Sequence, residues 1–351
     1  MTQQPLFTII LAGYQTEPYL QKALDSIANQ SFRDFEAVCY VEESTDRSLE
    51  MCRAMVERDS RFKVATGPKS GGVGATRNYG IDHASGKYLV VLDGDDWLAE
   101  DMLEKLADKL GQTGFIDIVS FATVSTETEN VDLSSAIRLT NFSAKDENVV
   151  FSGQDAIRKA GQNGGRFHAY TVLSIYRVEF LRRHHLYQKH GVMEDFEWTP
   201  RVWFHAKQMA YLDKVFYFYR RRPNSLTTEA SSRIIHDLTG HVCSLLAFAA
   251  SESVPDDILT IWSNQWISVL FWFMFHPVTS RKISDPDRKQ ALQKLLAFDG
   301  QIRFLTLLSR ASRPKRLARP LILLAAKGIQ IPAKVYFRKI YYPMIERKGK
   351  K

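Results

Sequence analysis

The chain has 351 residues and carries 47 Lys and Arg against 39 Asp and Glu, which gives a formal net charge of +8 at neutral pH. With 45% hydrophobic and 25% charged residues it has an ordinary globular composition, which excludes a disordered or fibrous chain. Its 3 scattered cysteines indicate neither a disulfide framework nor a CxxC metal site, and they favour a reducing, cytosolic setting.

Positive charge gathers at the C-terminal end. Residues 301–351 hold 14 Lys and Arg and a single Glu, so this basic tail carries +13 and residues 1–300 carry 8 − 13 = −5. The first residues lack the basic and long apolar regions of a signal peptide, and none is expected. The apolar stretches 266–275 and 321–326 are shorter than the roughly 20 residues that span a bilayer, so no transmembrane helix is expected.

Short apolar runs alternate with segments of helical periodicity through the first part of the chain. The runs are residues 7–12, 36–41, 62–65 and 88–92, and the helical segments are 19–29, 48–58, 75–84 and 100–110. This order predicts an open parallel sheet with crossover helices, which binds ligands beyond the carboxyl ends of its strands.

The later part of the chain has a different pattern. Residues 117–123 predict another strand, and a helix is expected from Gln154. From Ser231 onward, apolar residues recur every three or four positions, which predicts helices that Pro277 and later prolines keep short. We therefore expect two regions, residues 1–230 and a helical, basic region 231–351.

Three carboxylates, Asp93, Asp95 and Asp96, follow the run 88–92 directly, and Gly94 permits a tight turn between them. Close carboxylates repel one another, and a hard cation such as Mg²⁺ removes that repulsion by taking one or two of them together with substrate phosphates. Such a cation would neutralise a diphosphate leaving group. The alternative is an acidic turn that caps the next helix.

A second acidic string, Glu42-Glu43-Ser44-Thr45-Asp46, lies at another strand end. A carboxylate there accepts hydrogen bonds from a nucleobase or ribose. These residues also suit the N-terminal cap of the following helix, and the two roles are compatible.

Taken together, the motifs resemble glycosyltransferase family 2, the inverting GT-A enzymes. They are residues 7–20, 41–46, 74–81, 88–97, 193–198 and 219–227, in the order and spacing of that family. The resemblance implies an α/β, Rossmann-like, mixed but mostly parallel sheet with flanking helices. It also implies a nucleotide-sugar donor, most often a UDP-sugar, and a Mn²⁺ or Mg²⁺ ion.

The resemblance also implies a role for each matching residue. Asp95 corresponds to the metal ligand and Asp93 to a ribose or metal contact, with Gly94 between them. The remaining donor positions are Ala12, Tyr14 and Glu17 around the base and ribose, Glu42 and Arg77 on the nucleotide, and Arg220, Arg222 and Ser225 over the diphosphate.

Asp195 corresponds to the general base that takes the proton of the acceptor hydroxyl, and Glu194 to an acceptor-binding partner. Displacement at an anomeric carbon needs a stabilised leaving group on one face and a base on the other, so the set is chemically complete. The alternative for Glu194-Asp195 is an acidic first turn of a helix running to His205.

Two segments depart from the family pattern. Glu42-Glu43-Ser44 is one residue shorter than the usual nucleotide motif and lacks its glycine, which leaves the base unidentified. Ala12-Gly13-Tyr14-Gln15 lacks the proline and asparagine that often flank the tyrosine.

Other patterns carry less weight. The segment from Gly72 to Arg77 has an arginine where a dinucleotide fingerprint needs glycine, and His184, His185 and His190 fit a solvated helix end better than a metal site. The basic tail favours either a membrane interface with anionic lipid or a solvated or dimer-forming surface, and nothing in it matches a nucleic-acid module.

The resemblance implies an inverting, metal-dependent transferase acting on a glycan or lipid-linked acceptor in bacterial cell-surface polysaccharide synthesis. Its expected place is the cytoplasm, at the inner face of the membrane. The alternative is a catalytically inactive GT-A module that binds nucleotide or glycan as an interaction platform.

Overall fold

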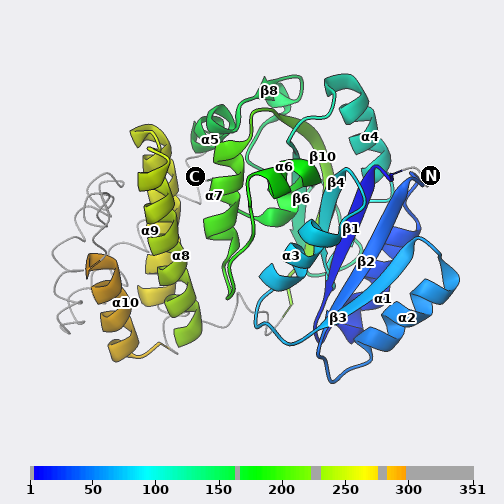
Figure 1. Cartoon of the computed structure of the whole chain (residues 1–351), viewed down its shortest axis with the longest axis horizontal. Helices are drawn as coiled ribbons and strands as arrows, with labels where there is room; N and C mark the ends of the chain where they lie inside the picture. Colours follow the sequence, from blue (N-terminus) through cyan, green and yellow to red (C-terminus); the bar gives the residue numbers. More distant parts are fainter. Residues whose placement is uncertain (1–3, 163–166, 223–230, 276–282, 298–351) are drawn as a thin grey trace. The chain divides into compact units, whose positions relative to one another are not determined.

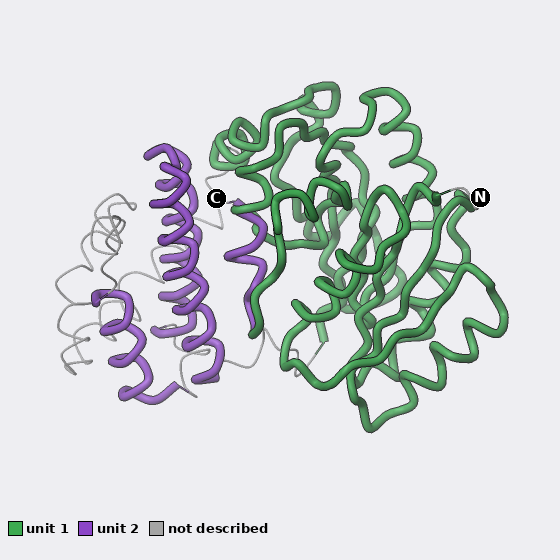
Figure 2. The backbone as a smooth tube through the Cα atoms, viewed as in Figure 1, with its two compact units in different colours: residues 1–163, 168–191, 201–222 green, residues 164–167, 192–200, 223–351 purple. Residues whose placement is uncertain are grey.

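In the computed structural model of the chain, residues 4–162, 167–222, 231–275 and 283–297 are described. They divide into two compact units (Figure 2). Unit 1 comprises Met1–Asn163, His168–Gly191 and Arg201–Arg222, and unit 2 comprises Gly164–Phe167, Val192–Pro200 and Pro223–Lys351. The boundary predicted near Ala230 lies outside the described residues, and it stays a prediction.

Unit 1 contains a ten-stranded sheet flanked by helices (Figure 1). Its strands are β1 Phe7–Gly13, β2 Phe35–Glu42, β3 Phe62–Gly67, β4 Tyr88–Asp93, β5 Trp97–Leu98, β6 Ile118–Thr126, β7 Ile137–Leu139, β8 Val150–Phe151, β9 Ser174–Arg177 and β10 Met209–Arg220. Its helices are α1 Glu17–Ala28, α2 Ser48–Arg58, α3 Gly74–His83, α4 Met102–Thr113, α5 Gly153–Gln162 and α6 Val178–Arg183, with 3-10 turns at Ala144–Asp146 and Thr171–Leu173.

The strand order is β3-β2-β1-β4-β9-β6-β10-β5. The strands β1 to β4 run parallel, as do β6 and β10, whereas β9 is antiparallel to both β4 and β6. The predicted mostly parallel, mixed sheet is therefore confirmed. Residues 7–13 and 35–42 are buried along their whole length, as expected for parallel strands with both faces covered.

The flanking helices lie close to their predicted positions. Helix α1 begins at Glu17, two residues before its expected start, because Pro18 fits the first turn of a helix, where its missing N–H costs nothing. One face of the sheet carries α3 and α6, and α1 and α2 lie together on the other (Figure 1).

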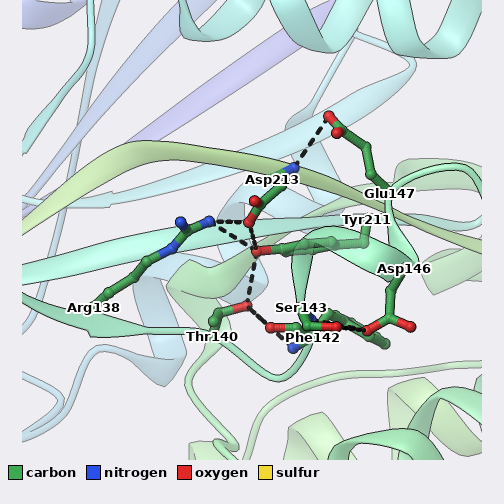
Figure 3. Close-up of polar contacts among 8 residues, drawn as sticks. All are labelled: Arg138, Thr140, Phe142, Ser143, Asp146, Glu147, Tyr211 and Asp213. Carbon is green, nitrogen blue, oxygen red and sulfur yellow. Dashed lines mark hydrogen bonds and ion pairs between the residues drawn. The ribbon is translucent and has the colours of Figure 1, made fainter.

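A buried tyrosine on β10 holds the segment that contains β7 and follows β6 (Figure 3). The Tyr211 hydroxyl accepts hydrogen bonds from Arg138 (3.1 Å) and Thr140 (3.2 Å) and donates one to Asp213 (2.6 Å). Burial, followed by the bond to Asp213, raises the pKa of Tyr211 to about 12. Arg138 also pairs with Asp213, whose backbone N–H donates to Glu147 at 3.4 Å. The segment thus joins the sheet through the short strand β7, which pairs with β6, and through these side-chain contacts with β10.

Unit 2 contains the long helices α8 Ser232–Ser251 and α9 Asp256–Phe275 and the shorter α10 Asp285–Ala297. The helix α7 Asp195–His205 begins in the Val192–Pro200 segment of this unit. The predicted short helices are wrong for α8 and α9, which have 20 residues each. Polar residues such as Ser263 and Asn264 interrupt the apolar run of α9 without ending the helix.

By length and composition alone, α8 and α9 are long and apolar enough to cross a membrane, which the sequence analysis did not expect. Half of the most apolar window of α8 and 61% of that of α9 are buried inside the protein. Mostly buried core helices of soluble proteins have the same length and composition, so both helices fit a core role equally well.

Candidate functional site

The carboxyl ends of β1, β2 and β4 bring several predicted residues together in unit 1. Ala12 on β1 lies opposite Asp93 on β4, and Glu42 ends the neighbouring β2. The Gly94 N–H donates to the Ala12 carbonyl at 2.9 Å. A Cβ at Gly94 would lie 2.8 Å from that carbonyl oxygen, so glycine is required here for the close approach of two backbones.

Asp93 is paired with Arg77. The guanidinium lies 3.3 Å from Asp93 Oδ1, and its other terminal nitrogen is 3.4 Å from both Thr171 and Gln188. Arg77 is buried in the first turns of α3, where an arginine is stable only when its charge is matched. The ion pair thus joins α3 to the end of β4.

Asp95 is paired with a different arginine, which lies two residues beyond the end of β10. Arg222 Nε lies 2.5 Å from Asp95 Oδ2. Arg220 Nε donates to the Asp95 carbonyl at 2.9 Å, and its guanidinium also contacts Glu129 and lies over the Trp97 ring. The ends of β4 and β10 therefore form one charged cluster.

The surroundings of Asp96 indicate a structural role. It is 1% exposed and accepts hydrogen bonds from the Tyr217 hydroxyl and the Arg220 N–H, both at 2.7 Å. Burial first, and then the charges of Asp95 and Asp93, raise its pKa well above the usual range of a carboxyl group. Because α4 begins only at Met102, after β5, the string 93–96 does not cap the next helix.

The end of β2 supplies a second group of contacts. Glu42 is buried, and its carboxylate accepts hydrogen bonds from the Ser70 N–H, at 3.1 Å, and from the Ser70 hydroxyl. Lys69 places its ammonium 4.7 Å from the centre of the Tyr14 ring. Sequence reasoning missed Lys69 and Ser70, although their position just after the third predicted strand was the available indication.

Asp46 joins the starts of α1 and α2. Its carboxylate accepts from the backbone N–H groups of Glu17 (2.9 Å) and Ser48 (3.1 Å). Burial raises the pKa of Asp46, but hydrogen bonds from Ser44, Glu17 and Ser48 outweigh burial and leave it below the usual value. The Glu17 carboxylate accepts from Arg47, first from its N–H and then from its side chain, and this lowers the pKa of Glu17. Arg47 occupies the N-cap position of α2, but the side chain that accepts a backbone N–H at the start of this helix is that of Asp46, one residue earlier.

Glu194 and Asp195 belong to unit 2. Glu194 is buried and Asp195 is the first residue of α7, while Met193 before them has a φ of 64°. Such a backbone conformation is uncommon for a residue other than glycine and is often found at functional sites.

Helices α8 and α9 hold this segment in place. Ser244 donates to the buried Glu197 at 2.9 Å, and Trp266 Nε1 donates to the Phe196 carbonyl at 3.2 Å. The Val192 N–H donates to Asp237 at 3.1 Å. The helical region, which the sequence analysis treated as separate, therefore supports the predicted base. Ser225 lies outside the described residues.

The charged cluster at the ends of β4 and β10 has side chains that fit a divalent cation. Asp93 and Asp95 offer hard carboxylate oxygens, the donors that Mg²⁺ and Mn²⁺ prefer. Within the described ranges, no group of three or more His, Cys, Asp or Glu side chains forms a complete cage. Two carboxylates suit an ion that completes its shell with substrate phosphates and water.

Comparison with known proteins places the chain in a family. The model of the family "Glycosyl transferase family 2" matches residues 8–184. The uncharacterized glycosyltransferase EpsJ of Bacillus subtilis is 28% identical over 64% of this chain, and the match spans 63% of EpsJ. The minor teichoic acid biosynthesis protein GgaB of Bacillus subtilis is 32% identical over 33% of this chain and 13% of GgaB.

Among solved structures, residues 1–349 of S. aureus TarS, in complex with UDP-GlcNAc, share the fold. The TM-score is 0.65 at 18% identity, covering 94% of this chain and 90% of that one. The fold is that of the GT-A enzymes, and the chain belongs to glycosyltransferase family 2.

Proposed function

We propose that the protein is an inverting, metal-dependent glycosyltransferase. It moves a sugar, of the hexosyl or N-acetylhexosaminyl type, from a UDP-sugar to a hydroxyl of a glycan or lipid-linked acceptor. The pathway is the synthesis of a bacterial cell-surface polysaccharide. Membership of the family supports the reaction, the UDP-GlcNAc bound to TarS supports the donor, and the name of GgaB supports the pathway.

The observation that carries the proposal is the charged cluster at the ends of β4 and β10. Asp93 and Asp95 each contact an arginine from another element, Arg77 and Arg222. Carboxylates for a cation and guanidinium groups for phosphate oxygens therefore occupy one sheet edge, where α/β sheets bind nucleotides. A bound Mn²⁺ or Mg²⁺ would supply charge stabilisation for the departing diphosphate.

We assign the remaining donor contacts to the neighbouring strand ends. Tyr14 offers an aromatic face to the base, and Glu42 offers an acceptor to a base or ribose donor. The Glu42 carboxylate accepts hydrogen bonds from Ser70, so a nucleotide would have to replace these bonds or share the carboxylate with Ser70. Arg220 is held by the Asp95 carbonyl and is positioned to keep the β10 end in place.

Asp195 is assigned the role of general base and Glu194 that of an acceptor contact. A general base must accept the acceptor proton as the new bond forms, and carboxylates commonly do this. Removal of such a base typically lowers the rate by a factor of about 10² to 10⁴. The bonds that α8 and α9 make to residues 192–197 support a rigid position for this carboxylate.

The test is a transfer assay with a panel of UDP-sugars, with Mn²⁺ and with a chelator. We expect Asp95→Asn to lower kcat/KM by at least about 10²-fold, the usual loss when charge stabilisation is removed. Asp195→Asn should lower kcat while UDP binding is retained. Asp108→Asn, an exposed aspartate on α4, is the matched control and should behave like the unmodified protein.

The product anomer, read by NMR, should be inverted relative to the donor. Transfer that is unchanged by chelation and by both substitutions would refute the mechanism. Binding of UDP without any transfer or donor hydrolysis would favour the inactive GT-A module instead.

A further inference from the structure

The carboxylate predicted to hold a cation already has a cationic partner. Arg222 Nε lies 2.5 Å from Asp95 Oδ2, and the two side chains are 26% and 18% exposed. The pair is thus shielded from solvent on most of its surface. A divalent cation on the same carboxylate would lie close to a positive guanidinium, and the two charges would repel each other.

The second ion pair at this sheet edge, Arg77–Asp93, has less freedom to rearrange. Arg77 is 4% exposed at its side chain and also contacts Thr171 and Gln188, so three groups fix its position. Arg222 lies two residues beyond the end of β10, and its guanidinium is 5.5 Å from the Tyr19 ring centre. Of these two arginines, Arg222 is the one placed to leave its carboxylate.

We propose that Arg222 competes with the divalent cation for Asp95 and thereby couples cation binding to diphosphate binding. This inference rests on the proposed function. When the cation takes Asp95, the guanidinium loses its anionic partner, and a diphosphate is the ligand that can replace it. Each ligand then favours the other, because the diphosphate stabilises the displaced arginine and the cation releases it.

The proposed coupling predicts that Arg222→Gln strengthens Mn²⁺ binding in the absence of nucleotide and reduces the effect of UDP on that binding. In Arg222→Gln, Asp95 loses the guanidinium that pairs with it, so Mn²⁺ without nucleotide should bind roughly five- to tenfold more tightly, at the lower end of common coupling strengths. The increase in Mn²⁺ affinity that UDP produces should shrink by a similar factor. Arg222→Lys keeps the charge but loses the planar fork, and it should lie between the two.

Arg221→Gln is the matched control. Arg221 is the adjacent arginine, paired at 3.0 Å with Glu127 on an exposed surface. Its removal changes the net charge by the same amount without touching Asp95. Free Mn²⁺ is measured by electron paramagnetic resonance with and without UDP, and UDP binding in chelator is measured by calorimetry on the same samples.

Tighter Mn²⁺ binding and a smaller UDP effect in Arg222→Gln, with Arg221→Gln unchanged, would support the proposal. Equal Mn²⁺ affinity and an equal UDP effect in all variants would overturn it while leaving the glycosyltransferase assignment intact. Binding of UDP but no Mn²⁺ by any variant would overturn both the coupling and the metal dependence. Absence of UDP binding by the unmodified protein would overturn the proposed function itself.

Discussion

The carboxyl groups of Asp93, Asp95 and Asp96 differ in what surrounds them. The first two contact arginine side chains, whereas Asp96 is buried and bound to Tyr217 and the Arg220 backbone. Burial also raises the pKa of Tyr217. Asp96 thus links the end of β4 to β10 and fixes the backbone that presents its two neighbours. A short acidic string can therefore combine ligand contacts with a structural anchor.

Glu36 at the other end of the sheet predicts an acid-sensitive contribution to stability. Burial raises the pKa of this carboxyl, but hydrogen bonds from Lys63, Ser85 and Thr8 outweigh burial and lower it from 4.5 to about 2. The folded state therefore favours the ionised form. Its stabilisation is present above pH 4.5 and is lost as the pH falls toward 2.

The difference of about 2.5 pKa units corresponds to about 3 kcal/mol at pH 7. We expect Glu36→Gln to lower the free energy of unfolding by up to that amount at pH 7, and by less than half of it at pH 3. Urea unfolding at several pH values measures this gap, with Glu57→Gln on the exposed end of α2 as the control. A gap that does not change with pH would contradict the prediction.

At the scale of elements, two helix glycines should respond in opposite directions to alanine. A Cβ at Gly80 of α3 would lie 3.0 to 3.1 Å from Ile10 atoms on β1, whereas no atom lies within 4 Å of a Cβ at Gly111 of α4. Gly111→Ala should stabilise the protein by about 0.5–1 kcal/mol, because alanine loses less backbone entropy in a helix. Gly80→Ala should be destabilising by about 1–3 kcal/mol through overpacking.

Thermal and urea unfolding of the two variants checks the pair. Since both changes add one methyl group to a helix, the difference between them isolates the packing of α3 on β1. Equal stabilisation by both substitutions would show that Ile10 moves away without cost.

The sequence predicted the elements whose pattern is local. Apolar runs bounded by turns located β1 to β4, and the acids after β2 and β4 lie at the carboxyl ends of these strands. Contacts such as Arg77–Asp93 and Arg222–Asp95 join different elements, so spacing alone could not reveal them. The lengths of α8 and α9 were underestimated because only short apolar runs were considered. Each helix continues across the polar residues that interrupt those runs.

At the scale of the whole molecule, the distribution of charge is uneven. Residues 301–351 carry +13 and the rest of the chain −5, so a negatively charged surface would attract the tail and repel the remainder. For the proposed lipid-linked acceptor, attraction of the tail to an anionic membrane would bring the protein close to its substrate. The two apolar helices α8 and α9 allow a second mode of membrane contact, and the two modes respond differently to salt.

We expect the full chain to bind vesicles that contain anionic lipid and to release them in high salt. Each basic residue near such a surface contributes about 1 kcal/mol, so replacing Lys334, Arg338 and Lys339 with Gln should weaken partitioning by about 10²-fold. The control replaces three exposed basic residues of unit 1, namely Arg53, Lys145 and Lys207, in the same way. Vesicle sedimentation measures binding, and light scattering in solution measures any dimer.

The salt wash separates the alternatives. Release by salt, with loss of binding in the tail variant alone, indicates peripheral attachment through the basic tail, because screening acts on exposed charges. Retention in salt with release only by detergent would instead assign the contact to α8 and α9, whose attraction to lipid is apolar. Loss of a dimer in the tail variant, with vesicle binding absent throughout, would make the tail an interface between two copies of the chain.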